Sequence, residues 1–285
     1  MSIYDIITNR IVEEIERNNV LPWEKEWGCN SIPVNTVSQK PYRGVNLLLL
    51  PQTPSNEFIS WCQLSDLREN NENLKLKKGC KQHMVVFYST IKDKLSVADK
   101  EEEQKEKGFL KYYKVFAIED VEGLESRRKI ICNNHNPIEE AESLINSYLH
   151  RENISLSLTD EDKAFYSPTF DRISIPKLQY FQSVNSYYQT FMHEIIHSSG
   201  NEKRLNRLSK TAFFGNHDYS LEELCAELGA NFLCCKLNLQ TDKSIRNGAA
   251  YIKSWLQVLK NDKTFIYRAS AQAQKAVDFI LNATT

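Results

Sequence analysis

The sequence predicts an α+β protein with two domains, a mixed α/β N-terminal domain and a mostly helical C-terminal domain. Residues 3–18 repeat apolar side chains at helical spacing, and the short apolar segments 85–88 and 112–116 are typical of strands. Helical periodicity dominates the second half of the chain. With 285 residues the chain is long enough for two cores, and we expect domains over residues 1–130 and 131–285.

The N-terminal half begins with the helix over residues 3–18, which ends before Leu21-Pro22-Trp23. The apolar run 47–50 fits a short helix or a strand. The two strand segments further along can pair with each other. Residues 92–108, which lie between these strands, carry many charges of both signs, a pattern typical of a mobile loop or a solvated helix.

In the C-terminal half, helical patterns cover residues 138–151, 249–261 and 267–282. Polar residues near 125–136 interrupt the periodicity and indicate the domain boundary. A further helix is expected to begin at Ser220, because a serine followed three residues later by Glu223 forms a capping box.

The composition is that of a soluble globular protein, with 41% hydrophobic and 26% charged residues. No segment approaches the roughly 18 apolar residues of a membrane span, and no signal peptide is visible, so we expect a cytoplasmic protein without a membrane partner. The seven cysteines form no regular framework and indicate a reducing compartment. Cys225, Cys234 and Cys235 are expected to be small core residues.

The strongest chemical signal is the segment His193-Glu194-Ile195-Ile196-His197. Helical residues four apart lie on one face, so the two imidazoles can share one Zn²⁺ while Glu194 acts on the water beside it. Residues 187–192 are apolar-rich and predict a partly buried helix, where these polar groups are costly without a metal. We therefore expect a metal site and not a polar helix face.

Catalytic zinc usually takes three protein ligands, and the third is less obvious. The pattern HExxHxxGxxH fails because Lys203 occupies the position of the third histidine. Glu223 and Glu227 share a helix face, so one can bind the metal while the other holds a histidine ring, whereas Glu222 is expected to point elsewhere. This arrangement resembles the gluzincin pattern, which implies Glu223 as the ligand and Glu227 as the partner of the first histidine. The reverse assignment is the alternative.

The expected chemistry is amide hydrolysis, with Glu194 as the proton acceptor. Tyr166, His217 and Tyr219 are candidates to stabilise the oxyanion, and the sequence does not rank them. Zn²⁺ is the expected ion, although Mn²⁺ or another divalent metal suits the same ligands. Arg204 and Arg207 are more commonly members of structural ion pairs than DNA contacts.

Bulk charge does not predict a DNA-binding domain. Residues 1–125 contain 17 Lys and Arg against 20 Asp and Glu, a net charge of −3. Residues 35–92 are locally basic, with eight cations against four acids, and their aromatic residues lie among these cations. Such a combination suits a groove for single-stranded DNA, although from composition alone the rings are at least as well explained as core residues.

Motifs along nearly the whole chain resemble those of ArdC-type antirestriction proteins from mobile genetic elements. In the N-terminal half these are Val20-Leu21-Pro22-Trp23 with Trp27, Pro41-Tyr42-Arg43-Gly44-Val45-Asn46, and Lys77-Lys78-Gly79. In the C-terminal half they are the HExxH segment followed by Gly200 and Arg204-Leu205-Asn206-Arg207, and Glu222-Glu223-Leu224 with Ala226-Glu227. Two departures are Ser198-Ser199 in place of the usual Trp-Thr, and the charged insert at 92–108.

The resemblance implies a domain that binds single-stranded DNA followed by a zincin-like metallopeptidase domain. It favours DNA binding over a core role for the aromatic residues, with duplex DNA as a further ligand. The residues expected to bind DNA are Trp23, Trp27, Lys40, Tyr42, Arg43, Trp61, Lys77, Lys78 and Lys81.

Three functions follow from these features. The first is a DNA-associated metallopeptidase that cuts a protein near the incoming strand during conjugation and so protects DNA from restriction. In the second, the protein protects DNA by occluding it, and the metal site is structural or inactive. The third is a metal-dependent toxin or regulator that acts on protein partners. An intact Glu194 favours the first, because a structural zinc site has no use for a base.

Overall fold

The computed structural model describes nine segments of the chain. They are residues 2–18, 21–22, 32–91, 107–128, 137–161, 163–181, 183–208, 217–239 and 249–282. The α-helices are α1 (Ile3–Asn18), α2 (Asn46–Leu49), α3 (Trp61–Asn70), α4 (Pro137–Glu152), α5 (Val184–Ser199), α6 (His217–Lys236), α7 (Ala249–Asn261) and α8 (Phe265–Ile280). Short 3₁₀ helices cover Ile118–Asp120 and Leu178–Tyr180. The strands are β1 (Val34–Asn35), β2 (Glu57–Ser60), β3 (Lys75–Leu76), β4 (His83–Ile91), β5 (Lys107–Ala117), β6 (Val121–Glu122), β7 (Ser155–Thr159), β8 (Phe165–Ser167) and β9 (Arg172–Pro176).

The N-terminal half is built around a four-stranded sheet with the order β1-β2-β5-β4. The two long strands β4 and β5 pair antiparallel, with Val85 opposite Tyr113 and Phe87 opposite Lys111. β2 pairs with β5 only at residues 115–117, so β4 and β5 continue beyond it as a two-stranded ribbon. α3 begins directly after β2, where Ser60 caps the helix in a capping box.

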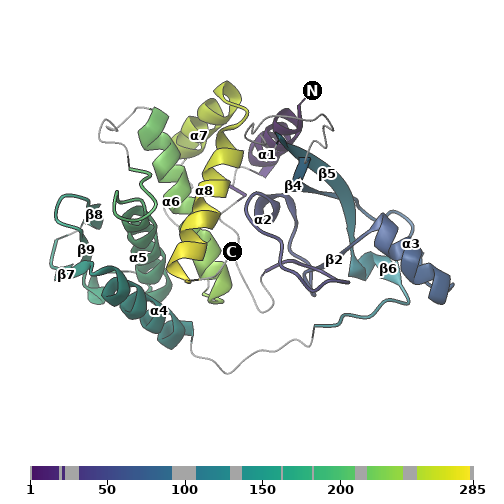
Figure 1. Cartoon of the computed structure of the whole chain (residues 1–285), viewed down its shortest axis with the longest axis horizontal. Helices are drawn as coiled ribbons and strands as arrows, with labels where there is room; N and C mark the ends of the chain where they lie inside the picture. Colours follow the sequence, from purple (N-terminus) through teal and green to yellow (C-terminus); the bar gives the residue numbers. More distant parts are fainter. Residues whose placement is uncertain are drawn as a thin grey trace, which may run out of the picture.

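Over its described residues, the C-terminal half contains five α-helices and a small sheet (Figure 1). In this sheet β9 lies in the centre, with β7 parallel on one side and β8 antiparallel on the other. α5 packs against β8, β9, α6 and α8. The sheet therefore covers one side of the helix that carries the HExxH segment.

One apolar core joins the two halves. Ile7, Ile11 and Ile15 of α1 belong to the same buried cluster as Leu259 and Phe265 of the C-terminal helices. α1 packs on α7 and α8, and its Thr8 hydroxyl donates to the carbonyl oxygen of Lys263 over 2.7 Å. Figure 1 accordingly places α1 beside α7 and α8, although it is the first element of the chain.

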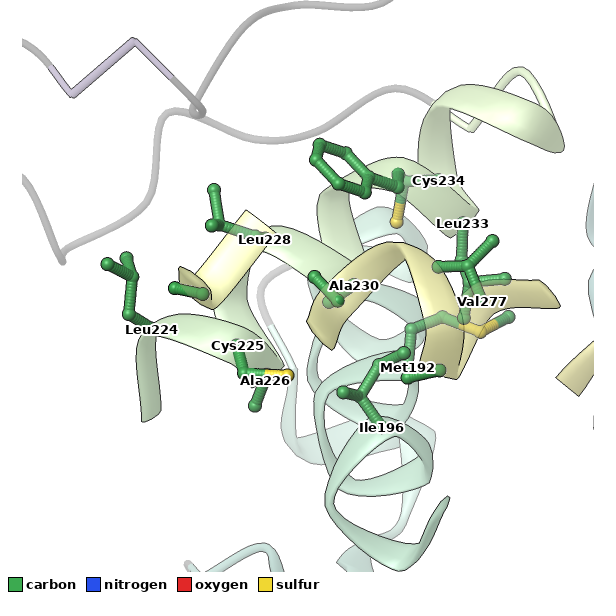
Figure 2. Packing of buried hydrophobic residues seen from close by; sticks show 14 of the residues in the cluster. Met192, Ile196, Leu224, Cys225, Ala226, Leu228, Ala230, Leu233, Cys234 and Val277 are labelled. Carbon is green, nitrogen blue, oxygen red and sulfur yellow. The ribbon is translucent and has the colours of Figure 1, made fainter. Parts of the chain in front are cut away.

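The packing of α5 on α6 fixes the site described below. Met192 and Ile196 of α5 lie in the cluster with Leu233 of α6 and Val277 of α8 (Figure 2). The helices approach closely at Gly229, where an added Cβ would lie 2.6 Å from Cδ1 of Ile196. Only glycine leaves room for this contact without displacing the isoleucine.

The α+β fold class is confirmed, and so is the antiparallel pairing of the two predicted strands. The run 47–50 forms the short helix α2. The mostly helical second half also contains the small sheet β7–β9. One expectation is wrong, because α6 does not begin at Ser220. This helix already includes His217, with the acidic Asp218 in its first turn, a favourable position for a negative charge.

Several predictions fall outside the described residues, among them the boundary at residues 130 and 131 and most of the charged insert at 92–108. Cys225, Cys234 and Cys235 are buried core residues as expected, and the five cysteines in the described part of the chain are free thiols. Over the described segments, no helix is long and apolar enough to cross a membrane.

Candidate metal centre

Three side chains from α5 and α6 converge at the predicted metal site. The Nε2 atoms of His193 and His197 are 3.1 Å apart, and each lies 3.6 Å from a carboxylate oxygen of Glu223. Two ligand atoms about 2.0–2.1 Å from a common ion in tetrahedral geometry are about 3.3 Å apart. The donor set and its spacing therefore fit one divalent metal ion.

The position of His197 is held by a buried ion pair. Its Nδ1 lies 3.1 Å from Oε1 of Glu222, and Arg207 donates to both oxygens of that carboxylate over 2.9 and 3.0 Å. Arg207 also donates to the carbonyl oxygen of Ile196 and to the hydroxyl of Ser199. The guanidinium thus ties the HExxH helix to α6 and fixes the carboxylate that orients the His197 ring.

The prediction that Glu222 points elsewhere is wrong. Neighbouring residues on a helix point about 100° apart, and the two nitrogens of an imidazole face different directions. Because Nε2 of His197 is directed toward Glu223, its Nδ1 faces Glu222, the residue before Glu223 on α6. Glu227 is buried one turn after Glu223, and its role as the partner of His193 stays a prediction.

A second ion pair links the end of α5 to the turn between β8 and β9. Arg204 pairs with Asp171 of the β8–β9 turn and donates to the carbonyl oxygen of Ser198 at the end of α5. The Tyr166 hydroxyl donates to Asp171 over 2.7 Å and accepts from Asn201 over 2.7 Å. The expectation that Arg204 and Arg207 form structural ion pairs is confirmed.

The three convergent side chains open into a cavity of about 660 Å³. Glu194, only 7% exposed, lines it together with Tyr219 of α6 and Phe165 of β8. The cavity offers both charged and apolar walls, as ligand-binding clefts commonly do.

The site is strongly polarised. Burial alone would raise the pKa of Glu223, but the hydrogen bond from His193 and the charges of both histidines outweigh burial and bring this pKa to about 2. Burial opposes charge on His197 as well, yet its contact with Glu222 raises the pKa of the imidazole above its ordinary value. The Glu223 carboxylate is therefore ionised at neutral pH, and its negative charge beside the two ring nitrogens favours a cation.

The three candidates for oxyanion stabilisation differ in the structure. The Tyr166 hydroxyl already donates to Asp171, so it has no proton left to donate to a substrate. The His217 side chain lies outside the described part of the chain. Tyr219 lines the cavity, as Tyr166 does, and its hydroxyl bonds to Glu223; burial together with this carboxylate raises the pKa of Tyr219 to about 12, which keeps the phenol protonated.

The residues expected to bind DNA lie in several different environments. Trp23 and Trp27 are outside the described residues, whereas Lys40, Lys77, Lys78 and Lys81 are exposed. Trp61 is 50% exposed, with the guanidinium of Arg68 over its ring. Arg43 forms an ion pair with Asp278 of α8.

The structure contradicts the prediction that Tyr42 binds DNA, because its ring is only 8% exposed and packs in a core cluster with Phe58 and Val85. Such a ring cannot offer a face to a base. Phe58 of β2 and Val85 of β4 lie on the face of the sheet that Tyr42 covers.

Two models of protein families match the chain. One is described as the N-terminal domain of anti-restriction factor ArdC and matches residues 1–116, and the other, a zincin-like metallopeptidase, matches residues 139–272. The fold is similar to the crystal structure of the antirestriction ArdC protein from the R388 plasmid, with a TM-score of 0.75 and 30% identity over 99% of this chain and 97% of that chain. The chain belongs to the ArdC antirestriction family.

Further relatives span the same length of this chain. The Mn(II)-bound crystal structure of the same ArdC protein has a TM-score of 0.76 and 30% identity, and covers 99% of this chain and 98% of that chain. Protein y4eC of Sinorhizobium fredii is 29% identical over 98% of this chain and 91% of its own length. A DNA primase TraC of Escherichia coli is 27% identical over 98% of this chain, but this match covers only 20% of the primase.

Proposed function

We propose that this member of the ArdC family is an antirestriction protein that binds single-stranded DNA and carries a zinc-dependent peptidase site. The convergence of His193, His197 and Glu223 beside Glu194 in one cavity carries the enzymatic part of this proposal. The placement of the four side chains supports amide hydrolysis because it joins a metal-ligand set to a buried base.

A divalent ion bound by these ligands would supply Lewis acidity to a substrate carbonyl and make water more acidic. The Glu194 carboxylate accepts the proton of the attacking water and passes it to the leaving amine. The protonated Tyr219 hydroxyl, which bonds to Glu223 in the structure, would turn to donate to the carbonyl oxygen as negative charge develops there. Arg207 and Glu222 hold His197 in place throughout, because their ion pair is buried against the helix that carries the histidine.

The substrate we propose is a protein close to DNA. Phe165 and Pro168 line the cavity and offer apolar contacts for side chains of a peptide. The N-terminal half, which matches the ArdC domain, would bring the peptidase site to single-stranded DNA as it enters a cell by conjugation. Relatives among plasmid proteins, including the antirestriction ArdC protein of the R388 plasmid, support a role in mobile genetic elements and a cytoplasmic location.

Glu194→Gln tests the enzymatic step, since the amide keeps the size of the side chain and cannot accept the proton. We expect this variant to retain its bound metal, to lose cleavage of quenched fluorescent peptides, and to fail in protecting unmodified DNA transferred into a restricting host. Glu202→Gln, the same change at an exposed position just beyond α5, serves as the matched control.

A second candidate function is protection by occlusion of DNA, which the exposed Trp61 and lysines of the N-terminal half favour. In this case Glu194→Gln would protect transferred DNA as well as the wild-type chain does. That result would remove peptidase action from the protective mechanism.

A further inference from the structure

The ribbon formed by β4 and β5 exposes aromatic rings that the motifs did not reveal. Phe87 is 41% exposed, and Tyr113 is 36% exposed. Their ring centroids lie 5.6 Å apart with the ring planes inclined by 61°, so the two rings meet edge to face and form one aromatic cluster. Paired exposed rings on a strand cost free energy in water unless they have a partner.

Strand register places Lys111 on the same face. It lies directly opposite Phe87, and Tyr113 follows two residues later on β5. Side chains two residues apart on a strand point to the same side of the sheet. Phe87, Lys111 and Tyr113 are therefore neighbours on one face, which we call the ribbon face.

The charged side chains of the ribbon strands are basic; Lys111 lies on the ribbon face, whereas Lys114 points with Tyr112 to the opposite face. Strands β4 and β5 together contain three lysines and one histidine, and no aspartate or glutamate. This is unusual in a half of the chain whose charge is negative overall, and it makes the ribbon complementary to a polyanion.

The strands that carry Phe87 and Tyr113 are anchored by buried residues of the sheet. Val85, the cross-strand partner of Tyr113, is fully buried, and so is Val115 on the same face. Both belong to the core cluster with Tyr42 and Phe58. Because this cluster holds the strands, the rings lose little freedom when a ligand stacks on them.

We infer that the ribbon face is a binding site for single-stranded nucleic acid, in which bases stack on Phe87 and Tyr113 while Lys111 contacts the backbone phosphate. The inference rests on the proposed function and gives its DNA-binding step a location. A planar base can stack on the exposed face of either ring, and a lysine beside the rings matches the phosphate that links successive bases. The site lies in the ordered sheet and not in the turn-rich segments to which the motifs pointed.

Fluorescence anisotropy of the full chain with a fluorescein-labelled oligothymidine of about 20 nucleotides tests this site. Phe87→Ala and Tyr113→Ala are each expected to raise Kd roughly 5- to 150-fold, the loss of one stacked base. Lys111→Ala should reduce the slope of log Kd against log salt concentration by about 0.7, the contribution of one phosphate contact. Phe87→Leu and Tyr113→Leu, which keep apolar packing but remove the aromatic face, should weaken binding in the same way.

Tyr112→Ala is the matched control, because Tyr112 is 47% exposed on the same strand but points to the opposite face. It should bind the oligonucleotide within about twofold of the wild-type chain. Equal binding by the Phe87/Tyr113 double variant and the wild-type chain would overturn the site and leave the proposed function intact, and it would point to a protein partner for the ribbon face. Loss of binding in Trp61→Ala alone would move the site to α3. Failure of the wild-type chain to bind at low salt would overturn the site together with the DNA-binding part of the proposed function.

Discussion

Arg207→Leu is expected to lower the free energy of unfolding of the metal-free protein by about 3–5 kcal/mol. The guanidinium is only 8% exposed and makes four hydrogen bonds, two of them to Glu222. The leucine would leave the Glu222 carboxylate, itself 11% exposed, without its counter-charge in a poorly solvated position. The cost comes from this stranded charge more than from the lost attraction.

The double variant Arg207→Leu/Glu222→Leu separates these contributions. With both partners removed, no buried charge is left without a counter-charge, so the double variant should be at least about 1–2 kcal/mol more stable than Arg207→Leu alone. His197 then lacks the acceptor for its Nδ1, and the affinity for metal should fall about 10–100-fold in spite of the recovered stability.

Urea unfolding in the presence of a chelator measures the stabilities, and calorimetric titration with Zn²⁺ measures the affinities. Lys203→Leu is the matched control, because its side chain is 69% exposed in the same loop and its loss should cost no more than about 0.5 kcal/mol. The reasoning would be refuted if Arg207→Leu were as stable as Lys203→Leu, or if the effects of the two leucines simply added.

Three further predictions follow from the site. Gly229→Ala places a Cβ 2.6 Å from Cδ1 and 2.8 Å from Cγ1 of Ile196, so α5 and α6 must separate by several tenths of an ångström. The metal affinity measured by calorimetric titration should therefore fall, and Ile196→Ala in the same chain should restore it. An unchanged metal affinity in Gly229→Ala would contradict the close packing of the two helices. Because the pKa of His197 is raised above its ordinary value of about 6.5, protons begin to compete with the metal for this imidazole at a pH above 6.5. The metal affinity should be constant at high pH and fall as the pH drops through the raised pKa. A metal affinity that does not change down to pH 5 would argue against His197 as a ligand. Tyr219→Phe should lower kcat for peptide cleavage about 10²–10³-fold while Tyr166→Phe has a much smaller effect, because the Tyr219 hydroxyl lies at the Glu223 ligand whereas the Tyr166 hydroxyl is held by Asp171 of the β8–β9 turn; the opposite order would exchange their roles.

The sequence predicted those features that depend on local spacing. The stacking of His193 and His197 follows from the period of a single helix, and the helices over 3–18 and 249–261 follow from their apolar faces. Pairing of β4 with β5 was predictable because both are short apolar runs joined by one polar segment.

Features that depend on the packing of one element against another were missed. The role of Glu222 depends on how α5 crosses α6, and no spacing within α6 distinguishes it from Glu223 as a neighbour of His197. Tyr42 lies among cations in the sequence but under the sheet in the fold. A usable signal did exist for the ribbon face, since the segment Lys111-Tyr112-Tyr113-Lys114 places two rings between two cations without an acid, but strand register was needed to place Phe87 beside it.

The most direct test of the metal centre is the stoichiometry and affinity of Zn²⁺ binding by the wild-type chain, His197→Ala and Glu223→Ala, measured by titration after removal of metal. Glu202→Ala serves as a control for the loss of an exposed carboxylate. We predict one tightly bound ion per wild-type and Glu202→Ala chain, no tight binding by His197→Ala, and severely weakened binding by Glu223→Ala. Wild-type affinity in Glu223→Ala, or no binding by the wild-type chain, would contradict the assignment of His193, His197 and Glu223 as the metal ligands.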